Sequence, residues 1–161
     1  MTTILSKSAQ EVQKSLEQKG LCCKVVELAT TTRTANDAAV SIGCEVGQIV
    51  KSLLFRTKKT FQPLLVLASG KNRVDEKVIE KLLDEKIEKA DADFTREITG
   101  FAIGGIPPIG HKQQIGHVFI DEELLQYETV WAAAGTPFAV FSMPSAALPE
   151  KTHGQVIKLK V

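Results

Sequence analysis

A loop rich in glycine and proline is the first candidate for chemistry in this chain. Residues 99–111 read TGFAIGGIPPIGH, with four glycines and two adjacent prolines among large apolar side chains. Glycine lets the backbone approach a ligand closely, whereas proline fixes the backbone and removes an N–H group. The pattern predicts a stiff ribbon whose N–H groups at Gly104, Gly105 and Ile106 face a bound group. A tight turn without a ligand uses the same residue types, so both interpretations stay open.

A single lysine is the second candidate. Lys51 is the only charged residue between Ile49 and Phe55, in a segment that is otherwise mostly apolar. Lysine is rarely buried without a partner. Its side chain either extends along the apolar surface to water or presents a fixed ammonium to a phosphate or carboxylate in a cleft.

Other chemistries find little support in the residue pattern. The three cysteines and three histidines lack the spacing of metal ligands, so we expect no metal and no other cofactor. Cys44 has no evident base beside it in the sequence, which argues against a thiol nucleophile. The pair Gly104-Gly105 follows neither of the common phosphate-loop patterns.

Regular elements must position these candidates. Hydrophobic spacing predicts helices over residues 8–19, 35–43, 75–83, 93–98 and 144–148, a helical turn over 121–125, and strands over 22–28, 46–56 (after an initial turn), 61–69, 117–120, 129–133, 138–141 and 155–159. Ser8 and Thr34 are expected to cap the first two helices. Because strands and helices mix without strict βαβ repetition, we expect a single α+β domain over residues 1–161.

Composition limits the partners. The chain is 43% hydrophobic and 24% charged, with a formal net charge of +1, as in ordinary soluble proteins. No apolar run approaches the roughly 18 residues that cross a bilayer, so we expect no membrane partner. No secretion signal is recognisable, and the odd number of cysteines fits a cytoplasmic protein. A protein that coats nucleic acid is strongly basic, so a nucleic-acid partner would be held by an end or a single nucleotide.

Several segments resemble, in the same order, the YbaK/prolyl-tRNA synthetase-associated domain family. They are residues 34–39 (TANDAA), 48–53 (QIVKSL), 69–75 (SGKNRVD), 99–110 (TGFAIGGIPPIG), 118–121 (VFID) and 134–136 (AGT). The resemblance runs from about residue 25 to the C-terminus, and the order of the segments is more specific than any one of them.

The resemblance implies a mixed, barrel-like β-sheet surrounded by helices. It also implies an aminoacyl-tRNA deacylase that edits in trans, hydrolysing the ester between a wrong small amino acid (cysteine, alanine, serine or threonine) and the 3′-terminal adenosine of tRNA. The expected partners are the 3′ end of an aminoacyl-tRNA and an aminoacyl-tRNA synthetase. Water or a group on the substrate itself would be the nucleophile, and backbone N–H groups would stabilise the oxyanion.

The resemblance also implies residue roles. The catalytic set is Lys51, Gly104 and Gly105, and the substrate-binding set is Thr34, Ser69, Ile106, Pro107, Pro108, Gly110, His111, Ala134, Gly135 and Thr136. Lys51 would hold the terminal nucleotide, and the loop backbone would bind the aminoacyl group. At residues 134–137 the sequence AGTP matches neither the histidine-bearing segment of the prolyl-synthetase insertion nor the Ser/Gly-Gly-Lys segment of the YbaK group. The amino acid removed therefore stays open.

Two further classes of function remain. One is a non-catalytic module of the same fold that binds tRNA or a synthetase, which the lone Lys51 disfavours. The other is a small-ligand domain unrelated to tRNA, whose binding would be insensitive to salt.

Overall fold

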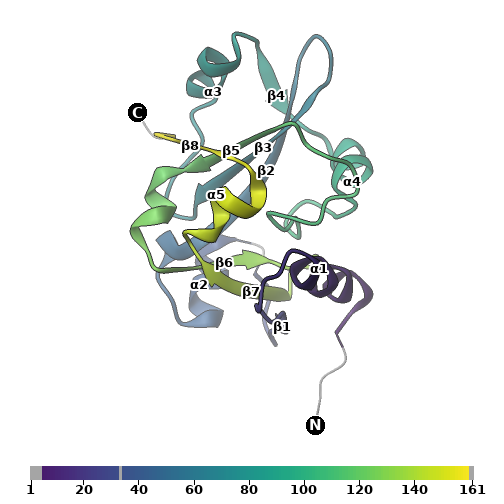
Figure 1. Ribbon diagram of the computed structural model, residues 1–161, viewed down its shortest axis with the longest axis vertical. Coiled ribbons are helices and arrows are strands. Elements are labelled where there is room, and N and C mark those ends of the chain that lie inside the picture. The colour runs from purple at the N-terminus through teal and green to yellow at the C-terminus, as the bar shows by residue number, and fades with distance from the viewer. Residues whose placement is uncertain (1–4, 33, 160–161) are drawn as a thin grey trace.

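One mixed β-sheet runs through the computed structural model, which describes residues 5–32 and 34–159 (Figure 1). Its eight strands follow the order β1-β7-β6-β2-β3-β5-β8, with β4 also paired to β2. The strands are β1 (Val26–Glu27), β2 (Ile49–Thr57), β3 (Pro63–Ser69), β4 (Ile87–Lys89), β5 (His117–Asp121), β6 (Thr129–Ala133), β7 (Ala139–Pro144) and β8 (Gln155–Ile157).

Helices and short helical turns surround the sheet. They are α1 (Lys7–Gln18), α2 (Ala35–Ile42), α3 (Glu76–Leu83), α4 (Ala92–Thr99), α5 (Ala147–Thr152), and the 3₁₀ turns η1 (Val46–Gln48) and η2 (Glu122–Gln126). In Figure 1, α3 and β4 lie at one end of the long axis, and β6, β7 and β1 lie at the other. No helix in the described ranges has the length and apolar character that crossing a membrane requires.

The predicted α+β domain with a mixed sheet is confirmed. Strands β2–β6, β3–β5 and β5–β8 pair in parallel, whereas β2–β3, β6–β7, β1–β7 and β2–β4 pair antiparallel. The sheet is not closed, because its path ends at β1 and β8, which do not pair with each other in the described chain. The resemblance implies a barrel-like sheet, and the structure shows that this sheet is open and does not close into a barrel.

The hairpin of β2 and β3 is the centre of the sheet. The residues of β3 from Leu64 to Ala68 are all 0% exposed, since apolar clusters cover both faces. A strand buried on both faces reads as a continuous apolar run, which is what these residues show. Helix α1 adds Val12 and Leu16, both fully buried, to one of these clusters.

On the side of β2 away from β3, two strands pair with different parts of β2 and leave a gap between them. Strand β6 pairs with Ile49 and Val50, and β4 pairs with Phe55 to Thr57. The Leu54 carbonyl accepts from the Ala90 N–H on this side of β2 at 3.1 Å. Backbone groups two residues apart in a strand face the same side, so those of Ser52 also face this gap. Residues 51–53 thus have no strand partner on this edge within the described ranges.

The structure corrects several predicted boundaries. Ser6, not Ser8, caps α1 by accepting from the Ala9 N–H. Only Val26 and Glu27 of the predicted strand 22–28 pair in the sheet, and the last helix begins at Ala147 rather than at residue 144. Strand β4 is absent from the sequence-based prediction.

Candidate functional site

A pocket of about 400 Å³ opens beside the unpaired edge of β2. Lys51, Gly104 and Ile106 line it together. The apolar part of its wall comes from α2, β2, β6 and β7, through Ile42, Ile49, Val50, Trp131, Ala132 and Val140. The lysine and the double-glycine ribbon therefore share one cavity, although about fifty residues of chain separate them.

The Lys51 side chain is fixed by a backbone carbonyl. Its Nζ donates to the carbonyl of Asn72 at 2.5 Å, in the turn that follows β3. An ammonium carries three donors, and the other two have no partner among the described residues. Lys51 can therefore hold an anion without giving up the contact that orients it.

Burial lowers the pKa of the Lys51 ammonium below its ordinary value. The nearby Arg73 guanidinium lowers this pKa further, whereas the Asp121 carboxylate raises it. Two cations and a partly dry pocket favour an anionic ligand, since an incoming negative charge would relieve the repulsion between Lys51 and Arg73.

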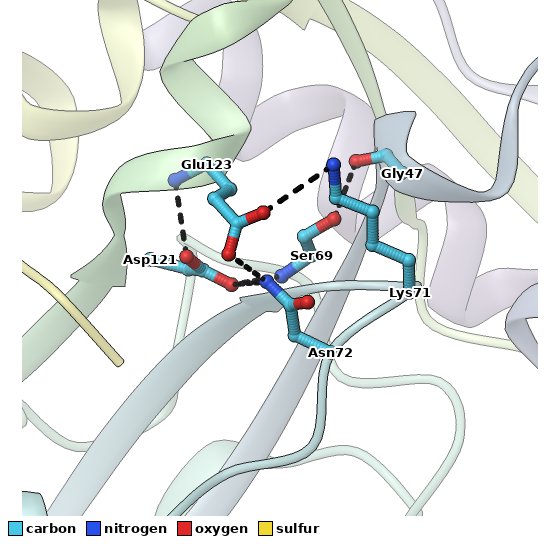
Figure 2. A network of polar contacts seen from close by, with 6 residues as sticks. All are labelled: Gly47, Ser69, Lys71, Asn72, Asp121 and Glu123. Atoms are coloured by element: carbon cyan, nitrogen blue, oxygen red, sulfur yellow. Dashed lines mark hydrogen bonds and ion pairs between the residues drawn. The ribbon is translucent and has the colours of Figure 1, made fainter. Parts of the chain in front are cut away.

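The turn after β3 is held by buried polar contacts, shown in Figure 2. Ser69 is fully buried, and its hydroxyl donates to the Gly47 carbonyl at 2.8 Å. Its N–H donates to the Asp121 carboxylate at 3.0 Å. Ser69, predicted as a substrate-binding residue, thus lies behind the pocket, whose lining is supplied here by Gly70.

The double-glycine ribbon does not present three bare N–H groups as the sequence predicted. The Gly105 N–H donates to the Ala102 carbonyl at 3.0 Å, closing a turn, so this donor is occupied. The N–H groups of Gly104 and Ile106 make no hydrogen bond to the described residues. Gly104 has a φ of +92°, a conformation that favours glycine.

The segment 134–136 packs against the ribbon from behind. The Gly135 N–H donates to the Gly105 carbonyl at 2.9 Å. The Ala134 N–H donates to the Ala139 carbonyl, and the Thr136 hydroxyl accepts from the Phe138 N–H at 3.1 Å. These three residues were predicted to bind substrate, and the structure places them outside the pocket lining, where they support the ribbon.

The second half of the loop leads away from the pocket. Pro108, Gly110 and His111 line a separate, open hollow of about 750 Å³ next to α1. Pro107 is buried, and its carbonyl accepts from Nε2 of His111 at 2.7 Å. Burial lowers the pKa of His111, and this contact with Pro107 opposes the shift. None of these four residues lines the pocket around Lys51.

Thr34, which was predicted to bind substrate, is in the pocket wall directly before α2. Its hydroxyl accepts from the Asp37 N–H at 3.0 Å and so caps the helix. The residue contributes both to the wall and to the helix that forms it.

Ser52 and Trp131 are two of the pocket residues that were not found from the sequence. Ser52 lines the pocket, and its Oγ is the only buried side-chain polar atom in the described ranges without a hydrogen-bond partner. A buried hydroxyl without a protein partner is costly, so a ligand or a water molecule is expected to complete its bonding. Trp131 is the only tryptophan of the chain and lines the same pocket. Nothing in the local sequence around a serine or a tryptophan on a strand marks it as a pocket residue.

The described residues offer neither a cluster of metal ligands nor an activated Cys44 thiol. In the described ranges, no three His, Cys, Asp or Glu side chains gather in a way that could hold a metal ion. Burial raises the pKa of the Cys44 thiol, the opposite of what activates a nucleophile. The chemistry open to the pocket is binding by a cation, backbone N–H groups and one hydroxyl.

Comparison with known proteins gives consistent matches. The aminoacyl-tRNA editing domain family matches residues 29–150. The protein YwhH of Bacillus subtilis (strain 168) is 30% identical, over 82% of this chain and 83% of its own. EbsC of Enterococcus faecalis (strain ATCC 700802 / V583), a candidate Cys-tRNA(Pro)/Cys-tRNA(Cys) deacylase, is 29% identical, over 78% and 76%. The solved structure of a candidate trans-editing enzyme for prolyl tRNA synthetase is 47% identical, with a TM-score of 0.92, over 98% and 99% of the two chains.

Proposed function

The chain belongs to the aminoacyl-tRNA editing domain family, and on that premise we propose that it hydrolyses the ester of a mischarged aminoacyl-tRNA. The observation that carries the proposal is the common pocket of Lys51 and the ribbon at Gly104 and Ile106. The substrate would enter as the 3′-terminal aminoacyl-adenosine, with no cofactor.

Lys51 would bind the phosphate of the terminal nucleotide. Its ammonium keeps two donors after the contact with Asn72, and Arg73 adds a second positive charge nearby. Contacts between lysine and phosphate are strong where both groups are partly removed from water. This contact would fix the ribose end of the ester against β2.

The ribbon would bind the aminoacyl carbonyl. The N–H groups of Gly104 and Ile106 are the donors without a partner at this wall, and Gly105 lets the chain turn close to Gly135. In the transition state the carbonyl oxygen becomes an oxyanion, which two fixed N–H groups stabilise more than they do the ground state. Water would add to the carbonyl carbon, and the ribose oxygen would leave with a proton, giving free amino acid and tRNA.

The pocket wall combines small apolar side chains with one hydroxyl. Ala132, Ala133 and Val140 line it together with the hydroxyl-bearing Ser52. The Ser52 hydroxyl, which has no partner in the described ranges, suits a short polar side chain such as that of serine, threonine or cysteine. Cysteine, alanine, serine and threonine therefore remain the proposed substrates.

The test is a panel of tRNAs charged with each of these amino acids, with correctly charged prolyl-tRNA as the comparison. We expect purified protein to release at least one amino acid faster than spontaneous hydrolysis does. Because Lys51 would position the ester, Lys51→Ala should lower that rate on the order of a hundredfold. Lys77→Ala, which removes an exposed lysine of α3 that does not line the pocket, is the matched control and should retain it.

A different outcome would identify a binding module. If the protein binds tRNA in a Lys51-dependent way but hydrolyses none of the panel, the proposed reaction is wrong and the non-catalytic alternative is favoured. The solved relative named for prolyl tRNA synthetase supports a synthetase as a further partner. Because charged tRNAs are used in translation, we place the proposed activity in the cytoplasm.

A further inference from the structure

We propose that Asp121 is a positioning residue for Lys51 and acts through Asn72. The inference deepens the proposed function, on which its activity readout rests. Asp121 is the last residue of β5 and does not line the pocket. Its side chain nevertheless determines where the carbonyl that holds Lys51 can lie.

The chain of contacts begins at the ammonium. Lys51 donates to the backbone carbonyl of Asn72, and the Asn72 side chain is itself almost fully buried, at 3% exposed. Its Nδ2 donates to Asp121 at 2.9 Å and to Glu123 at 2.7 Å, and both bonds are drawn in Figure 2. Both hydrogens of the Asn72 side-chain amide are therefore bonded, and these bonds fix the residue whose carbonyl holds Lys51.

Asp121 is a buried anchor of this network, with an exposed fraction of 1%. One of its oxygens accepts from both Asn72 and the Ser69 N–H, and the other accepts from the Glu123 N–H at 3.0 Å. A buried carboxylate with three hydrogen bonds is held in one orientation. It joins the end of β3, the turn after it and the start of η2 into one unit.

Strand register brings this carboxylate to the turn. Strand β5 lies parallel to β3, with Ile120 opposite Leu67, so the carboxyl ends of the two strands lie side by side. Asp121 therefore reaches the turn 69–72 from a strand about fifty residues away in sequence.

The charges around Lys51 make the effect measurable. Arg73 and Asp121 are the charged groups that act on the ammonium, with opposite signs. Glu123, which accepts from the Asn72 side chain, forms an ion pair with Lys71 at 3.4 Å. Removing the negative charge of Asp121 leaves Arg73 unopposed, so the pKa of Lys51 falls.

The experiment compares Asp121→Asn with Glu123→Gln, a control that removes one acid from the same network but not the buried anchor. The pH dependence of Lys51 acylation by a succinimidyl ester is followed on its peptide by mass spectrometry, with Lys77 as internal reference. We expect the Lys51 curve of Asp121→Asn to move to lower pH and that of Glu123→Gln to stay. Hydrolysis by Asp121→Asn should fall on the order of tenfold to a hundredfold, mainly in kcat.

The readouts separate the two proposals. Shifted acylation curves in both Asp121→Asn and Asn72→Ala, without hydrolysis by the wild type, would leave the positioning role standing and contradict the proposed reaction. A shift in Asp121→Asn alone would show a direct effect of its charge and overturn the role of Asn72. Equal curves for the wild type and a folded Asp121→Asn would overturn the positioning role. If Asp121→Asn does not fold, Asn72→Ala decides, because it keeps the carbonyl and the carboxylate but frees the turn. Its Lys51 curve should also move to lower pH, and an unchanged curve would overturn the inference.

Discussion

Gly135 and Gly105 are joined by a hydrogen bond of 2.9 Å from the N–H of the first to the carbonyl of the second. Their backbones approach so closely that a Cβ at Gly105 would lie 2.8 Å from the Gly135 carbonyl oxygen. The bond ties the ribbon that lines the pocket to the connection between β6 and β7. Both glycines are therefore needed for the shape of the site, although neither lines the pocket.

Gly105→Ala should destabilise the protein and open the ribbon. The new methyl group meets backbone atoms, which cannot rotate away, so we expect a loss of about 1–3 kcal/mol in the free energy of unfolding. Urea denaturation measures it. Gly116→Ala is the control, because a Cβ there has no neighbour within 4 Å, and it should change stability by less than about 0.5 kcal/mol. Equal stability of the two variants would contradict the close packing.

Binding of a nucleotide phosphate should weaken as the pH rises. The loss should begin at a lower pH than it would if the phosphate were held by an ordinary exposed lysine. Burial lowers the pKa of Lys51, so its positive charge is present at low pH and is lost early as the pH increases. Titration with adenosine 5′-monophosphate, followed by the fluorescence of Trp131 in the pocket wall, gives the dissociation constant at each pH. Lys51→Arg stays charged and should lose this dependence. The same pH dependence in both proteins would exclude Lys51 as its source.

Ser52→Ala should change which amino acid is removed. The buried hydroxyl lacks a protein partner and is available to a polar side chain of the substrate. We expect hydrolysis of seryl-tRNA to fall about tenfold, the worth of one hydrogen bond, and hydrolysis of alanyl-tRNA to stay within about twofold. Ser142→Ala on β7, outside the pocket lining, is the matched control. Parallel losses on both substrates would argue against a role in selection.

His111 should make the fold less stable in acid. Burial lowers its pKa in the folded state below the ordinary 6.5, so the unfolded chain takes up the proton first as the pH falls. The stability that neutral His111 provides is present above about pH 6.5 and is lost as the pH falls below that value. The Tm of the wild type should therefore drop more between pH 7.5 and 5 than that of His111→Gln, which does not titrate. Parallel Tm curves would show that the histidine is not responsible.

The pocket could be predicted in part because its signals are local. A lone lysine in an apolar strand and a run of glycine and proline stand out in a single sequence, and the order of the motifs linked them. That the two line one pocket was predicted correctly. The roles assigned to Lys51, Gly104 and Gly105 stay predictions until activity is measured.

The supporting contacts could not be predicted because they depend on strand order. Asp121 was expected only to begin a helical turn, and its oxygen does accept from the Glu123 N–H. Its other contacts, to Asn72 and the Ser69 N–H, require β5 to lie beside β3, which no local pattern encodes. Likewise, residues 22–28 have strand-like composition, but only Val26 and Glu27 find a partner, in β7. Strand β4 has three residues, too few for a periodic signal.

The donors that the pocket offers from the ribbon are main-chain N–H groups, so among substitutions only proline deletes one of them. The side chains that shape the opposite wall, Ile42, Trp131 and Ala132 among them, carry none of these donors. A gene for this fold can therefore accumulate wall substitutions and alter the accepted ligand while the N–H groups that we propose to bind the carbonyl persist. Related sequences are expected to diverge in preference far sooner than in the reaction they perform.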